Sequence, residues 1–198
     1  LAAEDPQGRG RDDLVGIRWG WGNATLFRLD GAGRVLWHRV LGRDVSGPYA
    51  SDVLLADLTG GGVREIVAAI CPHHEARDLL GADRVQAFRA DGSLLWRHAS
   101  PGFPRLVRGG LAVFDLDGDG KTEVLSIARM TDRPGNYALE ALDAEGKLLL
   151  HHPFTVSGES QPYSWNGWQM DVRPLEGGGA EVVFAASSES RLVGLRVL

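Results

Sequence analysis

The chain has 198 residues and a net charge of −5, with 43% hydrophobic and 24% charged residues. This balance is typical of a globular chain with one sizeable core and excludes a disordered protein. The charge argues against a nucleic-acid surface, the lack of an apolar run of about 18 residues predicts no transmembrane segment, and the single cysteine excludes an internal disulfide framework.

Along the chain, four segments share one pattern: an apolar strand, a glycine-rich acidic turn, an acid and a second apolar strand. The anchoring acids are Asp13, Glu65, Glu123 and Glu181. They recur at intervals of about 52 to 58 residues, which is typical of a repeat architecture. A second motif, a turn glycine followed four residues later by tryptophan, occurs at 33–37 and 92–96, and 146–150 repeats it with leucine. We predict one domain of four repeats, over approximately 1–41, 53–100, 111–154 and 168–198.

Each repeat is predicted to hold four short strands. The second strand is apolar on both faces, as over residues 123–128, so both of its faces must be covered. Stacked four-stranded sheets achieve this in a β-propeller, and a solenoid is the next option. We therefore expect an all-β, propeller-type array of about four repeats, the last incomplete, which is either a small propeller or part of a larger one. Trp37 and Trp96 occupy equivalent positions, so packing explains them better than binding.

The sharpest motif runs from Asp115 to Glu123. Its predicted ligands are the side chains of Asp115, Asp117, Asp119 and Glu123 and the main-chain carbonyl of Lys121. Carboxylates this close repel one another unless a cation lies among them, and hard oxygen donors favour Ca²⁺. An EF-hand requires an acid at its twelfth position, which is Ser126 here, so we exclude an EF-hand.

The equivalent loops of the other repeats carry fewer acids. The second repeat offers a weak second metal loop formed by Asp57, Thr59 and Glu65. In the first repeat, Arg9 lies where a central ligand would be, and we expect it to replace the ion by pairing with Asp5 and Asp13. The fourth repeat keeps its glycines and Glu181 and little else. We therefore predict one good Ca²⁺ site and one weak one.

These features together resemble the FG-GAP/VCBS repeat family, whose repeats form the blades of integrin-α-like β-propellers. Residues 115–123 match the calcium loop of that family, and the Gly-x-Leu-Leu-Trp segment at 92–96 suits its bacterial members. The resemblance implies a calcium-stabilised fold, an extracytoplasmic location (periplasmic or secreted), and a role in adhesion, ligand binding or subunit assembly. The chain supplies fewer repeats than most propellers of the family.

Aromatic residues in irregular segments are candidates for contact with a protein partner or a glycan. They are Trp19, Trp21, Tyr163 and Trp165. Loops on a rigid scaffold commonly carry recognition, and tryptophan and tyrosine are typical anchors.

Two further groups of side chains are weaker candidates. Cys71, His73 and His74 could hold a metal, although a polar loop after a buried cysteine explains them better. We expect the dipeptide His151-His152 to be solvated.

The sequence shows no triad order, phosphate loop or dinucleotide fingerprint. We therefore predict a non-catalytic, calcium-stabilised module for extracytoplasmic recognition or assembly, as an accessory subunit of a larger complex. One alternative is a polysaccharide lyase of the rhamnogalacturonan type, whose propellers carry similar loops. That chemistry needs a base near the acidic carbon of the substrate and an ion exposed to its carboxylate. A carbohydrate-binding module is the other alternative.

Overall fold

The structure is a computed structural model, and it describes residues 2–4, 12–20, 22–45, 49–71, 85–99, 105–130, 136–156, 168–176, 179–186 and 191–197. Within these ranges the chain forms fifteen strands in four antiparallel sheets and no helix. The predicted all-β class is therefore confirmed. No described segment could cross a membrane as a helix.

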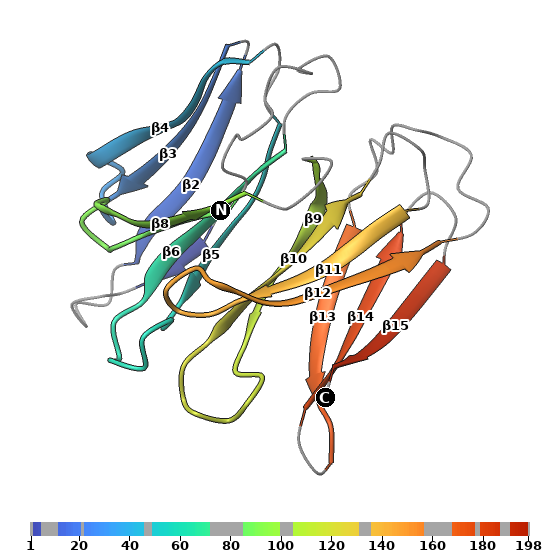
Figure 1. Cartoon of the computed structure of the whole chain (residues 1–198). Helices are drawn as coiled ribbons and strands as arrows, with labels where there is room; N and C mark the ends of the chain where they lie inside the picture. Colours follow the sequence, from blue (N-terminus) through green and yellow to red (C-terminus); the bar gives the residue numbers. More distant parts are fainter. Residues whose placement is uncertain are drawn as a thin grey trace.

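Each sheet is built from strands that are consecutive in the sequence (Figure 1). The first sheet contains β1 (Ala2–Glu4), β2 (Asp13–Gly20), β3 (Gly22–Leu29) and β4 (Val35–Val45). The second contains β5 (Tyr49–Ala56), β6 (Glu65–Cys71), β7 (Val85–Phe88) and β8 (Leu94–His98). The third contains β9 (Arg105–Phe114), β10 (Glu123–Arg129), β11 (Asn136–Leu142) and β12 (Leu148–Thr155). The fourth contains β13 (Trp168–Pro174), β14 (Ala180–Ala186) and β15 (Arg191–Val197).

The second sheet lies between the first and the third. Its strand β6 is buried on both faces, because alternate side chains of a strand point to opposite sides. Ile66 and Ala68 join an apolar cluster with the first sheet. Val67 and Ala69 join another cluster with the third sheet. The doubly apolar sequence of β6 is thus explained by a sheet packed on each side.

The third sheet is covered in the same way. Val124 of β10 packs toward the second sheet, whereas Leu125 and Ile127 pack against Val182 and Phe184 of the fourth sheet. Consecutive sheets therefore bury their faces against each other, and Figure 1 shows them following one another from blue to red.

A tryptophan on the last strand of one sheet packs on the turn glycine of the next. The Trp37 indole donates a hydrogen bond to the Ala90 carbonyl at 3.0 Å, and a Cβ atom added to Gly92 would lie 2.8 Å from the Trp37 ring. Trp96 repeats the contact: it donates to the Ala144 carbonyl at 2.8 Å, and a Cβ atom added to Gly146 would lie 2.6 Å from its ring. The predicted packing role of both tryptophans is confirmed, and the structure places each ring between two consecutive sheets.

Arginine side chains reinforce the junction between the first and second sheets. Buried Arg28 donates from Nη1 to the Ala90 carbonyl at 2.9 Å, the same carbonyl that Trp37 uses. Arg39 donates from Nε to the Gly92 carbonyl at 2.9 Å. Three side chains of the first sheet therefore hold one hairpin turn of the second.

At the junction between the third and fourth sheets, phenylalanine and tyrosine rings make the contact in place of tryptophan. Phe154 of β12 stacks on Tyr137 of β11, with ring centroids 5.7 Å apart. Phe154 also contacts Phe184 of β14, with centroids 4.9 Å apart. Leu150, which stands at the tryptophan position of this repeat, packs against the same cluster.

A buried carboxylate joins the second and third sheets. Glu140 of β11 is fully buried, and its Oε1 atom lies 3.0 Å from Nδ1 of His151. Its Oε2 atom lies 3.4 Å from Nε2 of His98 on β8. The expectation that the dipeptide His151-His152 is solvated is therefore wrong for His151, because its ring is half-buried and lies against a buried carboxylate.

We predict that Trp37→Ala lowers the free energy of unfolding by about 3 kcal/mol, because it removes both the ring on Gly92 and the bond to Ala90. Urea denaturation measures the change. The adjacent Leu36 is 52% exposed, so Leu36→Ala is the control and should change stability by less than about 0.5 kcal/mol. Equal losses from the two substitutions would show that the tryptophan contact adds nothing special.

Candidate metal centre

The turn between β9 and β10 winds around the side chain of Asp115. Its Oδ1 atom accepts the Gly118 backbone N–H at 2.7 Å, and its Oδ2 atom accepts the Gly120 N–H at 3.0 Å. Both glycines have positive φ, 76° and 87°, a conformation that other residues adopt only with strain. The alternating glycines of the sequence therefore allow a turn tight enough to gather carboxylates.

Glu123 is the first residue of β10 and lies at the end of the turn. Its side chain is only 4% exposed, and its Oε2 atom accepts the Leu116 N–H at 2.6 Å. This bond ties the end of the turn to its start. The side chain is therefore fixed in place before any ion binds.

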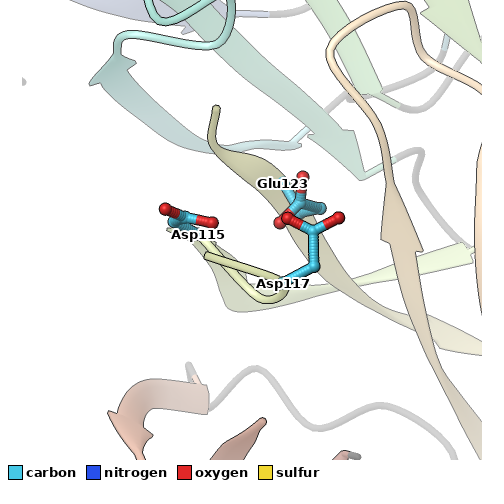
Figure 2. Close-up of side chains that lie close together, drawn as sticks. All are labelled: Asp115, Asp117 and Glu123. Carbon is cyan, nitrogen blue, oxygen red and sulfur yellow. The ribbon is translucent and has the colours of Figure 1, made fainter. Parts of the chain in front are cut away.

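One oxygen atom from each of Asp115, Asp117 and Glu123 lies within 4.8 Å of the other two, as Figure 2 illustrates. Oxygens at this separation can share an ion at about 2.4 Å, which falls within the Ca²⁺–oxygen range. Within the described ranges, Oε1 of Glu123 and Oδ2 of Asp117 accept no hydrogen bond. These two atoms keep their lone pairs for a cation.

The electrostatics of the turn favour a bound cation. Burial raises the pKa of Glu123, and the nearby charges of Asp117, Asp115 and Asp119 raise it further, while the Leu116 N–H opposes the shift. A raised pKa means that the folded turn disfavours the negative charge of Glu123. A divalent cation among the carboxylates would remove that penalty.

One further predicted ligand, Asp119, lies in the same turn but outside this group of three acids. Asp119 is exposed, and its Oδ1 atom accepts the Lys121 N–H at 2.8 Å. The role of the Lys121 carbonyl as a ligand stays a prediction. Its Oδ2 atom lies 3.9 Å from the Lys121 ammonium. The structure thus gathers the carboxylates of Asp115, Asp117 and Glu123 and gives Asp119 a local partner in Lys121.

The loop of the second repeat has the same backbone framework. Asp57 accepts the N–H groups of Gly61 and Gly62 at 3.0 and 2.6 Å, and Glu65 accepts the Leu58 N–H at 3.0 Å. Two carboxylates line this loop, whereas four line the loop of the third repeat. Thr59 is exposed and adds one hydroxyl. A weak second metal loop at Asp57, Thr59 and Glu65 stays a prediction.

The anchoring acids of the first and fourth repeats have other partners. Asp13 is buried and pairs with Arg28, whose Nη2 lies 3.0 Å from Oδ2. This pair could not be predicted from the sequence, because it depends on the register of β2 against β3. Glu181 lies 3.9 Å from Arg196. The predicted pairing of Arg9 with Asp5 and Asp13 involves residues outside the described ranges.

The remaining candidate residues fall outside what the structure describes. Trp21, Tyr163 and Trp165 lie outside the described residues, and so do His73 and His74. Trp19 and Cys71 contribute backbone to β2 and β6, while their side chains are not described. The proposed partner or glycan contacts and the Cys71-His73-His74 group thus remain predictions.

Comparison with known proteins finds similarity to solved structures. No protein-family model and no curated protein matches the chain. The exotype rhamnogalacturonan lyase YesX is similar with a TM-score of 0.51 and 15% identity, over 98% of this chain and 40% of that one. The Bacillus licheniformis rhamnogalacturonan lyase PL11 is similar with a TM-score of 0.52 and 18% identity, over 89% of this chain and 40% of that one. The chain therefore spans well under half of each enzyme, and the likeness shows the fold alone.

We predict that Glu123→Gln reduces the calcium-induced rise in melting temperature while leaving the calcium-free protein at least as stable at pH 7. Glutamine can still accept the Leu116 N–H, but it removes a charge that the turn disfavours. Because the folded pKa of Glu123 is raised, the penalty in calcium-free wild type is present at neutral pH and disappears as the pH falls below the ordinary glutamate value of 4.5. The stability difference between variant and wild type should therefore shrink on acidification, as thermal melts would record.

The matched control is Glu65→Gln, the same substitution at the equivalent position of the second loop. It should leave most of the calcium response in place. A full calcium response in Glu123→Gln would remove this residue from the site.

Proposed function

We propose that the chain is a non-catalytic β-propeller-type scaffold of the FG-GAP/VCBS kind, stabilised by Ca²⁺ at residues 115–123. The observation that carries this proposal is the convergence of Asp115, Asp117 and Glu123 within 4.8 Å in a turn built by backbone hydrogen bonds. The face-to-face packing of consecutive sheets supports the propeller-type arrangement. In this proposal the ion holds the turn, and the sheets carry the recognition loops.

The metal turn also touches its neighbour, so an ion there would stabilise more than one repeat. A Cβ atom added to Gly60 in the second loop would lie 3.1 Å from the Gly120 carbonyl oxygen in the third. Fixing the third turn therefore supports the position of the second. An ion bound at one loop contributes to the junction between two sheets.

The proposed location of the protein follows from the proposed ion. Ca²⁺ is abundant outside the cytoplasm, and the exposed carboxylates of the turn, such as Asp117, have little positive charge of the protein itself to balance them. We place the module in the periplasm or outside the cell, as an accessory subunit that binds a protein partner or a glycan. The aromatic residues Trp19, Trp21, Tyr163 and Trp165 are the proposed contacts.

Removing calcium with a chelator should destabilise the protein. At a free Ca²⁺ concentration of 100 times the dissociation constant, binding contributes about 2.7 kcal/mol, which corresponds to about 5–10 °C in Tm for a chain of this length. Thermal melts in excess chelator and in excess CaCl₂ measure the difference, with MgCl₂ as the control ion. A melting temperature that ignores calcium, together with no heat of binding in calorimetry, would refute the structural role of the ion.

A polysaccharide lyase is the second candidate function, because two similar structures with TM-scores above 0.5 are rhamnogalacturonan lyases. In such a reaction a base removes the proton beside a uronate carboxylate, the bond to the leaving oxygen breaks, and an unsaturated sugar forms. Calcium would neutralise the carboxylate, and it could reach substrate only from the exposed side of the turn, where Asp117 lies.

A panel of pectic polysaccharides separates the two candidates. The scaffold proposal predicts no rise in ultraviolet absorbance with any substrate at saturating calcium. A calcium-dependent rise that Asp117→Asn abolishes would replace the scaffold with the enzyme. Intrinsic tryptophan fluorescence recorded with the same glycans detects binding without turnover, which is the outcome expected of a carbohydrate-binding module.

A further inference from the structure

The turn of the first sheet has the same construction as the two turns that receive a tryptophan. Asp30 donates its N–H to the Arg34 carbonyl at 2.9 Å and accepts the Gly33 N–H at 2.8 Å. The turns at 89–93 and 143–147 make the same two bonds. The three turn glycines share one conformation, with φ of 81° at Gly33, 79° at Gly92 and 80° at Gly146.

The first turn differs from the others in what lies against its glycine. A Cβ atom added to Gly92 or Gly146 would lie 2.8 or 2.6 Å from a tryptophan ring atom. A Cβ atom added to Gly33 meets nothing within 4 Å among the described residues. The turn at Gly33 thus has the conformation of a tryptophan-binding turn, but no described tryptophan lies against it.

The part of the sheet face next to this turn is apolar and incompletely covered. Leu14 pairs with Leu29, and Leu29 pairs with Val35, so these three side chains share a face of the first sheet. Leu14 and Leu29 are half-buried, and Val35 is 62% exposed. Val40, farther along β4 and paired with Thr25 on the same face, is 43% exposed. These residues form an exposed, largely apolar surface next to the Gly33 turn, and the same face also carries His38 and Arg18 farther from the turn.

In the next sheets the equivalent face is buried by the sheet before it. Ile66 and Phe88 of the second sheet stand where Leu14 and Leu29 stand in the first, and both are buried against the first sheet. Val124 and Leu142 hold these positions in the third sheet and are buried in the cluster shared with the second. Within the described part of the chain, the face of the first sheet that carries Leu14 and Leu29 is therefore the same interface without a sheet packed on it.

We propose that the Gly33 turn and this face are the docking site for one further four-stranded sheet of the same repeat type. Its last strand carries a tryptophan four residues after its own turn glycine. The tryptophan packs on Gly33 and donates its indole N–H to the carbonyl of Gly31, which corresponds to Ala90 and Ala144 in the later turns. The inference rests on the proposed stacking of repeats and not on calcium.

A second copy of this chain fits the site less well. Trp37 and Trp96, the described tryptophans at this position, already pack on Gly92 and Gly146. The third sheet carries Leu150 there. A repeat with an unused tryptophan is the occupant that reproduces both the ring contact and the hydrogen bond.

The test uses the full chain with a second copy of residues 49–104 fused ahead of Leu1, so that a tryptophan-bearing sheet precedes the Gly33 turn. Stability is measured by urea unfolding in four variants. In these variants the tryptophan of the added copy is kept or replaced by alanine, and Gly33 is kept or replaced by alanine. Because any Cβ atom at Gly33 would meet the ring, the two substitutions should not be additive. We expect a coupling of about tenfold in the unfolding equilibrium constant.

Two controls separate docking from backbone strain and from instability of the added copy. Gly62→Ala introduces the same strain, since Gly62 has a φ of 77° and open space around it, and it should show no coupling to the added tryptophan. Limited proteolysis should find the added copy protected with Gly33 and digested with Gly33→Ala. Additive substitutions, or digestion of the added copy in every variant, would overturn the proposal.

Light scattering of the original chain tests the competing occupant. A monomer is expected, and a concentration-dependent dimer that Gly33→Ala abolishes would assign the site to a second copy and overturn the proposal. Calcium melts on the same extended chain are read separately. If the two substitutions are additive but calcium still raises the melting temperature, only the docking site is refuted. If the substitutions are coupled but calcium has no effect on the melting temperature, only the calcium scaffold is refuted.

Discussion

A strand that is apolar on both faces has to be covered on both faces, and this constraint organises the molecule. The second strands of the middle sheets, β6 and β10, are buried on each side, so neither sheet could be stable alone in water. Stacking satisfies the constraint only if consecutive sheets keep a fixed distance and angle. The contact of a tryptophan with the glycine of the next turn provides that alignment, because a ring fits there only where no Cβ atom stands.

Features set by neighbouring residues could be predicted from the sequence. The strand pattern, the hairpins and the acidic turn each lie within a few residues, so the all-β class and the gathering of Asp115, Asp117 and Glu123 followed from local spacing. The packing of Trp37 and Trp96 followed from their equivalent positions. Side-chain pairs that depend on strand register could not be foreseen, as with Arg28 and Asp13 or Glu140 and His151 on neighbouring strands. The contact of Glu140 with His98 depends on how two sheets pack.

The repeats show how one framework accommodates different chemistry at the same position. The acid that begins the second strand of a repeat binds the N–H of its own turn in the second and third repeats, through Glu65 and Glu123. In the first repeat the shorter Asp13 pairs with a buried arginine. The backbone of the turn thus persists without a full set of carboxylates, which is why a metal function can be confined to one repeat while the fold is shared.

The proposed scaffold role and the docking face depend on consecutive sheets being joined by tryptophan on glycine, as at the first two junctions. Nuclear magnetic resonance measures this contact directly, because an indole ring stacked on a glycine shifts the glycine Hα resonances upfield. The account predicts strong upfield shifts for Gly92 and Gly146 and ordinary values for Gly33, which shares their conformation but has no ring beside it. Indistinguishable shifts at the three glycines would contradict it.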